Sequence, residues 1–336
     1  FSAQYETYSV SAGSIRPINL GNVNLKPAFA KEQEIGIDMV WFNQVAAGVT
    51  YAQSEVDDQF LNVPLPGFAG FGNQWRNAGT LESNTFEAYV ETALIDSPEA
   101  TWSSRVNFDR TRQEITRLDV PPYRFGSNSA FYMREGEVYG TFYGNRFATR
   151  CNELPEEMQA KCSTEFQVND DGYLVWVGAG NNYTDGIAKG LWGTTGDDGY
   201  GWGVPFTAVE MQDGEETDFL EMGNTLPEFN LSWSNTFRWK NFQIYGLLDY
   251  EYGAEIYNGT AQWGYREAKH GEVDQFGKDE GKKKPVGYYA TLYNVNEISS
   301  HFVEDGTYLK LREMSLRYTF DQAQLGRLIG NRFGLT

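Results

Sequence analysis

The sequence predicts an all-β protein of the transmembrane-barrel type, and two observations support this prediction. Apolar and polar residues alternate over runs of about 9–14 residues, which is longer than the ~5–6 residues of an average soluble strand and enough for a tilted membrane crossing. The connections between these runs are alternately short and long. This pattern places all short turns on one side of a sheet and all long loops on the other, as in outer-membrane barrels, whereas a soluble sandwich has no reason to sort its loops.

The alternation is clearest in FNLSWSNTFRW at 229–239, where five of the six residues at every second position from Phe229 are apolar or aromatic. One face carries Phe229, Leu231, Trp233, Phe237 and Trp239, and the other carries Asn230, Ser232, Ser234, Thr236 and Arg238. The same pattern recurs at 34–41, 45–53, 85–95, 102–109, 242–251 and 314–320. These runs predict about eight strands, each with one face in lipid and the other in a watery lumen.

The connections have two length classes. We expect short periplasmic turns at 42–44, 96–100 and 240–241, with a fairly short one at 321–327. We expect long extracellular loops at 55–81, 111–225 and 255–304. Long loops are normally either disordered or functional. These are rich in Trp, Tyr and Gly rather than in residues typical of disorder, so we expect them to be ordered.

The alternation changes phase once, near Arg312-Glu313. Met314 and Leu316 continue an apolar face, but upstream Leu309 and Leu311 have the opposite phase. A β-bulge would explain the change, because it shifts the alternation by one residue. Alternatively, Leu309 and Leu311 lie above the bilayer and pack under a loop.

Composition excludes several classes of protein. The net charge is −19, which argues against a nucleic-acid surface because such a surface needs a basic stripe. No apolar run approaches the ~20 residues of a membrane helix. The chain opens without a charged-then-apolar leader. We therefore expect the sequence to be a fragment of a longer chain.

The two cysteines lie close together in the longest predicted loop, at Cys151 and Cys162. A close pair in an otherwise cysteine-free chain favours a disulfide in an oxidising compartment over two free thiols. Closing so short a loop would add about 3 kcal/mol by the chain-entropy model. We expect no zinc site, because neither His270 nor His301 lies at ligand spacing.

Sequence motifs for chemistry are weak. Adjacent carboxylates occur at 57–58, 170–171, 197–198 and 215–216, but all fall in predicted loops, where solvated acids are common. Calcium could bind NDDG (169–172) or TGDDG (195–199), yet neither has EF-hand spacing, so ordinary turns are favoured. No Ser/His/Asp or Cys/His constellation is evident. The sequence predicts no enzyme and no required cofactor.

The aromatic residues divide into two groups. Those on strands predict a lipid-facing girdle: Trp233, Phe237, Trp239, Tyr318 and Phe320. Those in long loops could stack on a sugar ring or a peptide side chain, or else pack the loops together: Trp75, Trp176, Tyr183, Trp192, Tyr200 and Trp202. We take the second group as the candidate ligand-binding residues.

Four segments carry a family resemblance. FVEDGTYLKLREMSLRYTF (302–320) closely resembles the signature near the C-terminus of SusC/RagA-type TonB-dependent outer-membrane transporters. NVNLKPAFAKEQEIGIDM (22–39), NVPLPGFAGFGNQWRNAGTLESNTFEAYV (62–90) and GNTLPEFNLSWSNTFRWKNFQIYGLLDYEYGAEIYN (223–258) are similar to further family segments, in the same order. Two departures are Ala28, where Glu is common, and Asn84-Thr85, where Gly is common.

The resemblance implies a barrel of about 22 strands. Residues 1–336 would form its C-terminal portion, with an N-terminal plug and the final strands absent and with 111–225 as a long extracellular loop. It further implies a bacterial outer-membrane protein that imports oligosaccharides or peptides under a SusD-like surface lipoprotein, energised by the TonB–ExbB–ExbD complex. Two alternatives are a structural or adhesion barrel without transport, and a soluble secreted glycan-binding β protein.

Overall fold

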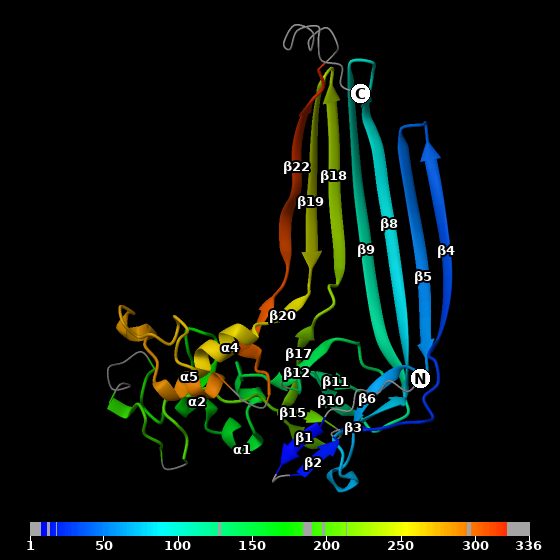
Figure 1. Ribbon diagram of the computed structural model, residues 1–336. Helices are drawn as coiled ribbons and strands as arrows, with labels where there is room; N and C mark the ends of the chain where they lie inside the picture. Colours follow the sequence, from blue (N-terminus) through cyan, green and yellow to red (C-terminus); the bar gives the residue numbers. More distant parts are fainter. Residues whose placement is uncertain are drawn as a thin grey trace.

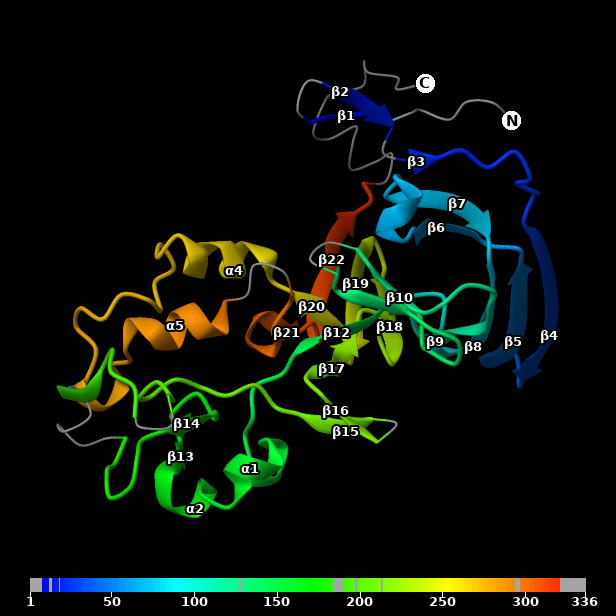
Figure 2. The same ribbon diagram turned by 90° about the horizontal axis from the view of Figure 1, so that it is seen from below.

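Seven long strands form one antiparallel sheet in the order β22-β19-β18-β9-β8-β5-β4 (Figure 1). The computed structural model describes residues 8–11, 14–17, 19–126, 129–183, 190–196, 199–212, 214–293 and 297–320. The long strands are β4 (Phe29–Trp41), β5 (Val45–Asp57), β8 (Gly79–Asp96), β9 (Ala100–Leu118), β18 (Phe229–Trp239), β19 (Phe242–Tyr252) and β22 (Tyr308–Tyr318). Viewed from below, they follow an arc (Figure 2). The strand expected after 321–327 lies outside the described residues.

Short turns join the long strands at one end of the sheet, at 42–44, 97–99 and 240–241. Two of the three match the predicted turns residue for residue, and the third is two residues shorter. In the turn at 42–44, Phe42 and Asn43 have positive φ angles of 53° and 55°, and Lys240 has 51° in the turn at 240–241. All long connections emerge at the opposite end, which Figure 1 draws at the bottom. The predicted sorting of turns and loops is therefore confirmed.

Strand register aligns one apolar and one polar face across the whole sheet. A single row of paired residues crosses all seven strands as Ile37, Val49, Ala88, Phe108, Leu231, Tyr250 and Leu309. The next row crosses as Asp38, Gly48, Tyr89, Asn107, Ser232, Asp249 and Lys310. Because successive side chains point to opposite faces, these two rows belong to what we call the apolar face and the polar face.

Aromatic residues mark both ends of the apolar face. Near the short turns, Trp239, Phe242 and Tyr318 lie side by side, with Phe320 against Tyr318. Near the loops, Phe86, Phe108, Phe229 and Tyr252 lie in ring contact. The 11 residues of β18 span about 34 Å, and a ~40° tilt reduces this to about 26 Å, close to the ~25 Å apolar band of outer-membrane barrels. The apolar face thus has the height of a bilayer.

The phase change in β22 is a β-bulge. Leu247 pairs with Glu313 and the next residue, Leu248, pairs with Leu311, so Arg312 is the extra residue. Because β19 itself is regular, the bulge returns Leu309 and Leu311 to the apolar face. No loop among the described residues covers Leu309 and Leu311, since they are 67% and 60% exposed. The bulge is therefore correct, and the alternative that these leucines pack under a loop is wrong.

Two strands are longer than the alternation predicts. β8 and β9 run from Gly79 to Asp96 and from Ala100 to Leu118, and their loop-side ends pair from Gly79–Leu118 onward. Polar residues such as Ser83 and Gln113 occupy these ends on both faces. Apolar periodicity ends where the strands leave the bilayer, although backbone pairing continues, so the sequence pattern underestimates their length.

Outside the long sheet, the segment before β4 and the long connections fold into small elements rather than open coil. The strands are β1 (Tyr8–Ser11), β2 (Ser14–Pro17), β3 (Asn19–Leu20), β6 (Phe60–Pro64), β7 (Asn73–Asn77), β10 (Tyr123–Phe125), β11 (Phe131–Met133), β12 (Thr141–Asn145), β13 (Phe166–Val168), β14 (Leu174–Trp176), β15 (Glu210–Gln212), β16 (Glu215–Thr217), β17 (Phe219–Asn224), β20 (Glu255–Tyr257) and β21 (Val303–Asp305). The α-helices are α1 (Glu156–Gln159), α2 (Cys162–Glu165), α4 (Gly259–Arg266) and α5 (Val286–Leu292). In the described part of the chain, no helix is long and apolar enough to span a membrane.

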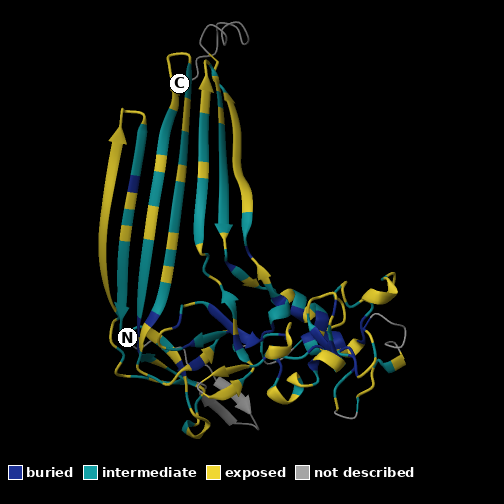
Figure 3. Cartoon of the chain, turned by 180° about the vertical axis from the view of Figure 1, so that it is seen from behind, coloured by how far each residue is buried: buried dark blue, intermediate teal, exposed yellow. Residues whose placement is uncertain are grey.

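Buried residues gather at the loop end of the molecule, and the sheet itself is covered little by protein (Figure 3). We call the described residues of 119–228 and 253–307 the loop domain. Its largest core joins the two loops, because Phe147, Val177 and Trp202 of the first pack with Tyr288 and Phe302 of the second. The two longest loops therefore share one core, and their described residues are ordered, as predicted.

Candidate functional site

The polar face of the sheet is held by ion pairs and hydrogen bonds between neighbouring strands. Arg105 Nη1 lies 3.2 Å from Glu91 Oε2, and Arg312 Nη2 lies 2.6 Å from Asp249 Oδ2. The Tyr89 hydroxyl donates to Asp38 Oδ1 at 2.9 Å across Gly48. A Cβ on Gly48 would lie 2.4 Å from the Tyr89 ring, so glycine is required for that contact. A polar, charged wall of this kind suits a water-filled lumen.

Two of the six predicted ligand-binding aromatics lie in the core of the loop domain. Trp202 is 2% exposed and its indole N–H donates to the Val177 carbonyl at 2.9 Å. Tyr183 is 8% exposed and its hydroxyl donates to Asp170 at 3.1 Å. The structure gives both rings a packing role, which was the stated alternative. Ligand contact by them stays a prediction.

Three more predicted aromatics surround the same region but are only partly buried. The Trp176 indole N–H donates to Glu165 Oε2 at 3.0 Å, and the Tyr200 ring stands edge-on to it with centroids 6.1 Å apart. A Cβ on Gly196 would lie 2.2 Å from the Trp176 ring, so this glycine lets the backbone approach the indole. Trp192 is partly buried and packs against the core of the loop domain. The structure thus brings five of the six residues together.

A pocket of about 360 Å³ opens beside Trp176. Its wall combines the indoles of Trp176 and Trp202 with the polar side chains of Glu165, Asn181 and Thr194. The lining is mixed, and aromatic side chains beside a few convergent polar groups are a common setting for small-molecule binding. We take this pocket, which we call the Trp176 pocket, as the candidate binding site. Sequence reasoning found Trp176 but missed Glu165, which no motif distinguishes.

Trp75, the sixth predicted residue, lies elsewhere. It sits on β7 in the small sheet β3-β7-β6 and is 43% exposed. Figure 2 shows β7 on the opposite side of the molecule from β13 and β14, which carry the Trp176 pocket. The structure therefore does not bring Trp75 to the other five residues, and a ligand-binding role for it would need a separate site.

The NDDG segment is tied by a lysine from the other long loop. Lys284 Nζ lies 2.8 Å from Asp170 and 3.3 Å from Asp171, and its side chain is only 6% exposed. Tyr288 also donates to Asp171. Within the described residues, no cluster of His, Cys, Asp and Glu is arranged for a metal. The carboxylates proposed as calcium ligands thus serve as a clamp between 165–183 and α5, and TGDDG lies partly outside the described residues.

A second clamp between the loops centres on His301. Its Nδ1 lies 3.1 Å from the Tyr173 hydroxyl and its Nε2 lies 2.8 Å from the Tyr265 hydroxyl, which donates to Glu272. Burial lowers the pKa of His301 below its ordinary value of 6.5, and burial raises the pKa of Tyr173 to about 12. A neutral imidazole between two neutral phenols joins the loops at neutral pH.

This burial predicts a pH dependence of the loop domain. Because the folded pKa of His301 lies below its unfolded value, the contribution of His301 to stability is constant above about pH 7 and falls as pH drops through 6.5 toward the folded pKa, by at most about 1.4 kcal/mol per pH unit. Hydrogen exchange of α4 and α5 between pH 7.5 and 5 measures this fall. His301→Gln should remove most of it, whereas His270→Gln should keep it; equal profiles in the two variants would contradict the assignment.

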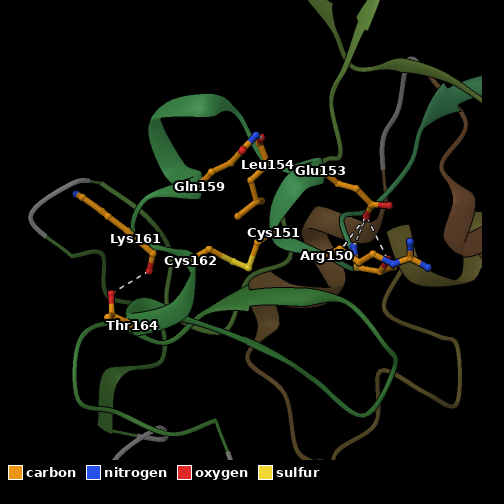
Figure 4. The surroundings of a disulfide bond; sticks show 9 residues. Arg150, Cys151, Glu153, Leu154, Gln159, Lys161, Cys162 and Thr164 are labelled. Atoms are coloured by element: carbon orange, nitrogen blue, oxygen red, sulfur yellow. Dashed lines mark hydrogen bonds between the residues drawn. A yellow bond between two sulfur atoms is a disulfide. The ribbon is translucent and has the colours of Figure 1, made fainter.

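The two cysteines are paired in the structure, with Cα atoms 5.7 Å apart (Figure 4). Cys162 is buried and is the first residue of α2. Cys151 lies in a short helical turn, and Glu153 of that turn accepts hydrogen bonds from the backbone N–H groups of Thr149 and Arg150. The bond closes the segment that carries α1. It lies in the longest loop, between β9 and β18, at the loop end of the sheet.

We expect the oxidised protein to show no free thiol, and the double substitution C151S/C162S to lower the stability of the loop domain by about 3 kcal/mol. Mass spectrometry after alkylation without reductant counts the thiols. Two alkylated cysteines would refute the pairing. Protease resistance of the oxidised and reduced forms then measures the stabilisation.

Comparison with known proteins places the chain among outer-membrane receptors. The family model described as TonB dependent receptor-like, beta-barrel, matches residues 1–188. TonB-dependent receptor P3 of Formosa agariphila is 24% identical over 319 residues, covering 92% of this chain and 29% of that protein. TonB-dependent receptor P39 of the same organism is 24% identical over 339 residues, covering 95% and 32%. The chain spans about a third of the length of these curated relatives.

Solved structures share the fold. The RagAB peptide importer in its closed-closed state has a TM-score of 0.62 at 16% identity, covering 95% of this chain and 32% of that chain. Its open-open state has a TM-score of 0.61, also at 16% identity, covering 96% and 32%. The family resemblance read from the sequence is therefore confirmed, and the relatives are named as receptors and importers, not as enzymes.

Proposed function

Because the chain belongs to the TonB-dependent receptor-like β-barrel family of the bacterial outer membrane, we propose that the full-length protein imports nutrients across that membrane. Its substrates are oligosaccharides or peptides. The TonB–ExbB–ExbD complex supplies energy through the N-terminal part of the protein, and a SusD-like surface lipoprotein covers the loops. The chain described above supplies part of the barrel wall and the loop domain.

One observation carries the proposal: an amphipathic wall of bilayer height joined to an ordered domain with an aromatic core. The seven strands supply the wall, and the two longest loops supply the domain. A barrel that only anchored itself in the membrane would need short hairpins, and most connections in compact domains are about 4–6 residues. Ordered loops of this size are better explained by binding.

The Trp176 pocket supports a role in capture of either substrate class. An indole face stacks on a sugar ring or on an aromatic or aliphatic side chain, and the Glu165 carboxylate accepts hydrogen bonds from a sugar hydroxyl or a peptide amine. RagAB is a peptide importer. This supports peptides, in addition to oligosaccharides, as proposed substrates of this protein. Trp176→Ala should weaken capture about tenfold, the equivalent of one lost stacking contact.

A lipoprotein lid is supported by apolar side chains that stand in solvent at the loop end. Phe68 is 93% exposed, Phe276 is 94% exposed and Val286 is 85% exposed. Single exposed apolar residues are common on protein surfaces, so these three side chains are contact points for the proposed lid and not a continuous apolar patch. Purification of the full-length protein from native membranes in mild detergent tests the partner, because a lipoprotein should co-elute with it. Repeated elution without one would contradict this part of the proposal.

Uptake by intact cells tests the function. Cells carrying the full-length protein should accumulate fluorescent peptides or fluorescent oligosaccharides, and should lose that uptake when TonB is deleted. Trp176→Ala should reduce uptake at low substrate concentration, whereas Trp263→Ala, at an exposed site on α4, should not. Binding to cells without TonB-dependent uptake would favour the adhesion barrel. The soluble glycan-binding alternative disagrees with the family match.

A further inference from the structure

The acid excess of the chain is concentrated at the loop end of the sheet. Residues 119–228 and 253–307 contain 28 Asp and Glu against 12 Lys and Arg, whereas the rest of the chain contains 18 against 15. A uniform excess would serve solubility, but a local one creates a negative potential that attracts cations and repels anions. A ligand that approaches the loop domain therefore meets a field that selects by charge.

Glu165 extends this selection into the Trp176 pocket. Among the described residues that line the pocket, Glu165 is the only charged one. Its Oε2 accepts the indole N–H of Trp176 at 3.0 Å, and its Oε1 has no hydrogen-bond or ion-pair partner in the described part of the chain. The pocket thus contains a fixed carboxylate and, within its described lining, no cation that balances it.

Other acids of the same loops are neutralised from within the protein. Lys284 pairs with Asp170 at 2.8 Å, and Arg146 pairs with Glu210 at 2.5 Å. Those carboxylates join segments of the loop domain, so they have a structural role. Glu165 differs from them because it lines a pocket and keeps one carboxylate oxygen for a donor from outside the described chain.

The aromatic side chains beside Glu165 also favour a cation. Trp176 and Trp202 both line the pocket, and Trp is the best aromatic partner of an ammonium or guanidinium group. A carboxylate forms a shorter and stronger hydrogen bond with a charged donor than with a neutral one. A cationic group gains from both contacts, whereas a neutral hydroxyl gains only an ordinary hydrogen bond from Glu165.

The size and lining of the pocket suit one long side chain. Its volume of about 360 Å³ lies near the lower end of the ~300–1,000 Å³ range of ligand pockets. Ala179 and Leu191 contribute apolar surface to the lining. Lys and Arg side chains lay an apolar stem along such surface and keep the charged head at a polar group. An amino sugar carries its ammonium group directly on the ring and has no such stem.

We propose that the substrate is a basic peptide and that the Trp176 pocket receives one of its Lys or Arg side chains. The cationic head donates to Glu165, and the side chain contacts Trp176. The acidic surface of the loop domain raises the local concentration of such peptides. This inference rests on the proposed import function and narrows its substrate class. Acidic peptides and acidic oligosaccharides are excluded, because their carboxylates would lie against Glu165 without a cation.

The test measures binding of three dye-labelled peptides to the full-length protein in nanodiscs by fluorescence anisotropy. The peptides are Ala-Ala-Lys-Ala-Ala and its Gln and Glu counterparts, and we expect the Lys peptide to bind most tightly. Glu165→Gln keeps an acceptor for the Trp176 N–H but removes the charge. It should lower the affinity for the Lys peptide about tenfold, the difference between a charged and a neutral hydrogen bond. Its affinity for the Gln peptide should stay unchanged, which also shows that the variant is folded.

Glu157→Gln is the matched control, because it removes the same charge at an exposed site on α1. A preference for Lys that is lost in Glu165→Gln and kept in Glu157→Gln supports the site. Equal affinity of the three peptides contradicts it, as does a preference that persists in Glu165→Gln. Binding of a glucosamine oligomer in place of the Lys peptide would contradict a peptide as the source of the cation.

Uptake separates this inference from the proposed function. TonB-dependent uptake of the Lys peptide in preference to the Gln peptide supports both. Uptake of the Gln peptide or of a neutral oligosaccharide at the same rate as the Lys peptide would refute the charge preference and leave the import function intact. Absence of TonB-dependent uptake for every probe would refute the import function itself.

Discussion

Trp233→Arg should lower the free energy of unfolding of the full-length barrel in lipid by about 2–4 kcal/mol, the cost of a cation on the lipid face near the bilayer midplane. Trp233 lies near the middle of β18, between the two aromatic rows, and is 43% exposed in the absence of lipid. Its row neighbours are Val106 and Leu248, so the guanidinium would find no carboxylate in the hydrocarbon. Folding titrations into lipid vesicles measure the loss.

Ser232→Arg is the matched control for this effect. Ser232 is the adjacent residue of the same strand, but it lies on the polar face beside Asn107 and Asp249. An arginine there would meet water and a carboxylate, so the expected change is within about 1 kcal/mol. Equal losses in the two variants would contradict the assignment of the faces.

Lys284→Met should lower the stability of the loop domain by about 3 kcal/mol. Removing one partner of a buried ion pair costs about 3–5 kcal/mol, because the remaining charge is uncompensated. Asp170 and Asp171 keep 36% and 35% of their side-chain exposure, which places the cost at the lower end. Limited proteolysis and hydrogen exchange of 165–183 and α5 report the loss.

Lys283→Met provides the control, one residue away. Lys283 pairs with Glu280 at 2.6 Å, and that carboxylate is 67% exposed. Surface pairs contribute about 0–1 kcal/mol, so protection of the loop domain should hardly change. If Lys284→Met leaves protection as high as Lys283→Met does, then Lys284 does not join the two loops.

The sheet could be predicted from the sequence because a bilayer imposes a strict period on it. Each side chain between Phe229 and Trp239 faces either lipid or water, so alternation shows directly in the residues. The same strictness reveals Arg312 as a bulge, since one extra residue reverses the phase. Above the bilayer the constraint is lost, and polar residues such as Ser83 and Gln113 give no sign that β8 and β9 continue.

The loop domain could not be predicted in the same way. Lys284 meets Asp170, and His301 meets Tyr173, across segments far apart in sequence, and no local pattern links them. The aromatic residues were identified, yet sequence alone could not separate the buried Trp202 from the partly exposed Trp176. Packing decides that difference. The acidic pair at 170–171 is a further example. Its sequence suggests a calcium-binding turn, but its contacts with Lys284 and Tyr288 link the two loops.

Single-cysteine accessibility along β18 tests most directly the central claim that this sheet is a membrane wall with one lipid face. Each residue from Asn230 to Arg238 is replaced by Cys in the full-length protein, in which Cys151 and Cys162 are held in the disulfide, and labelling of the unsubstituted protein gives the background. A membrane-impermeant maleimide is applied to the protein in lipid. We expect labelling at 230, 232, 234, 236 and 238 and protection at 231, 233, 235 and 237. Uniform labelling, or protection at the serines instead, would contradict the account.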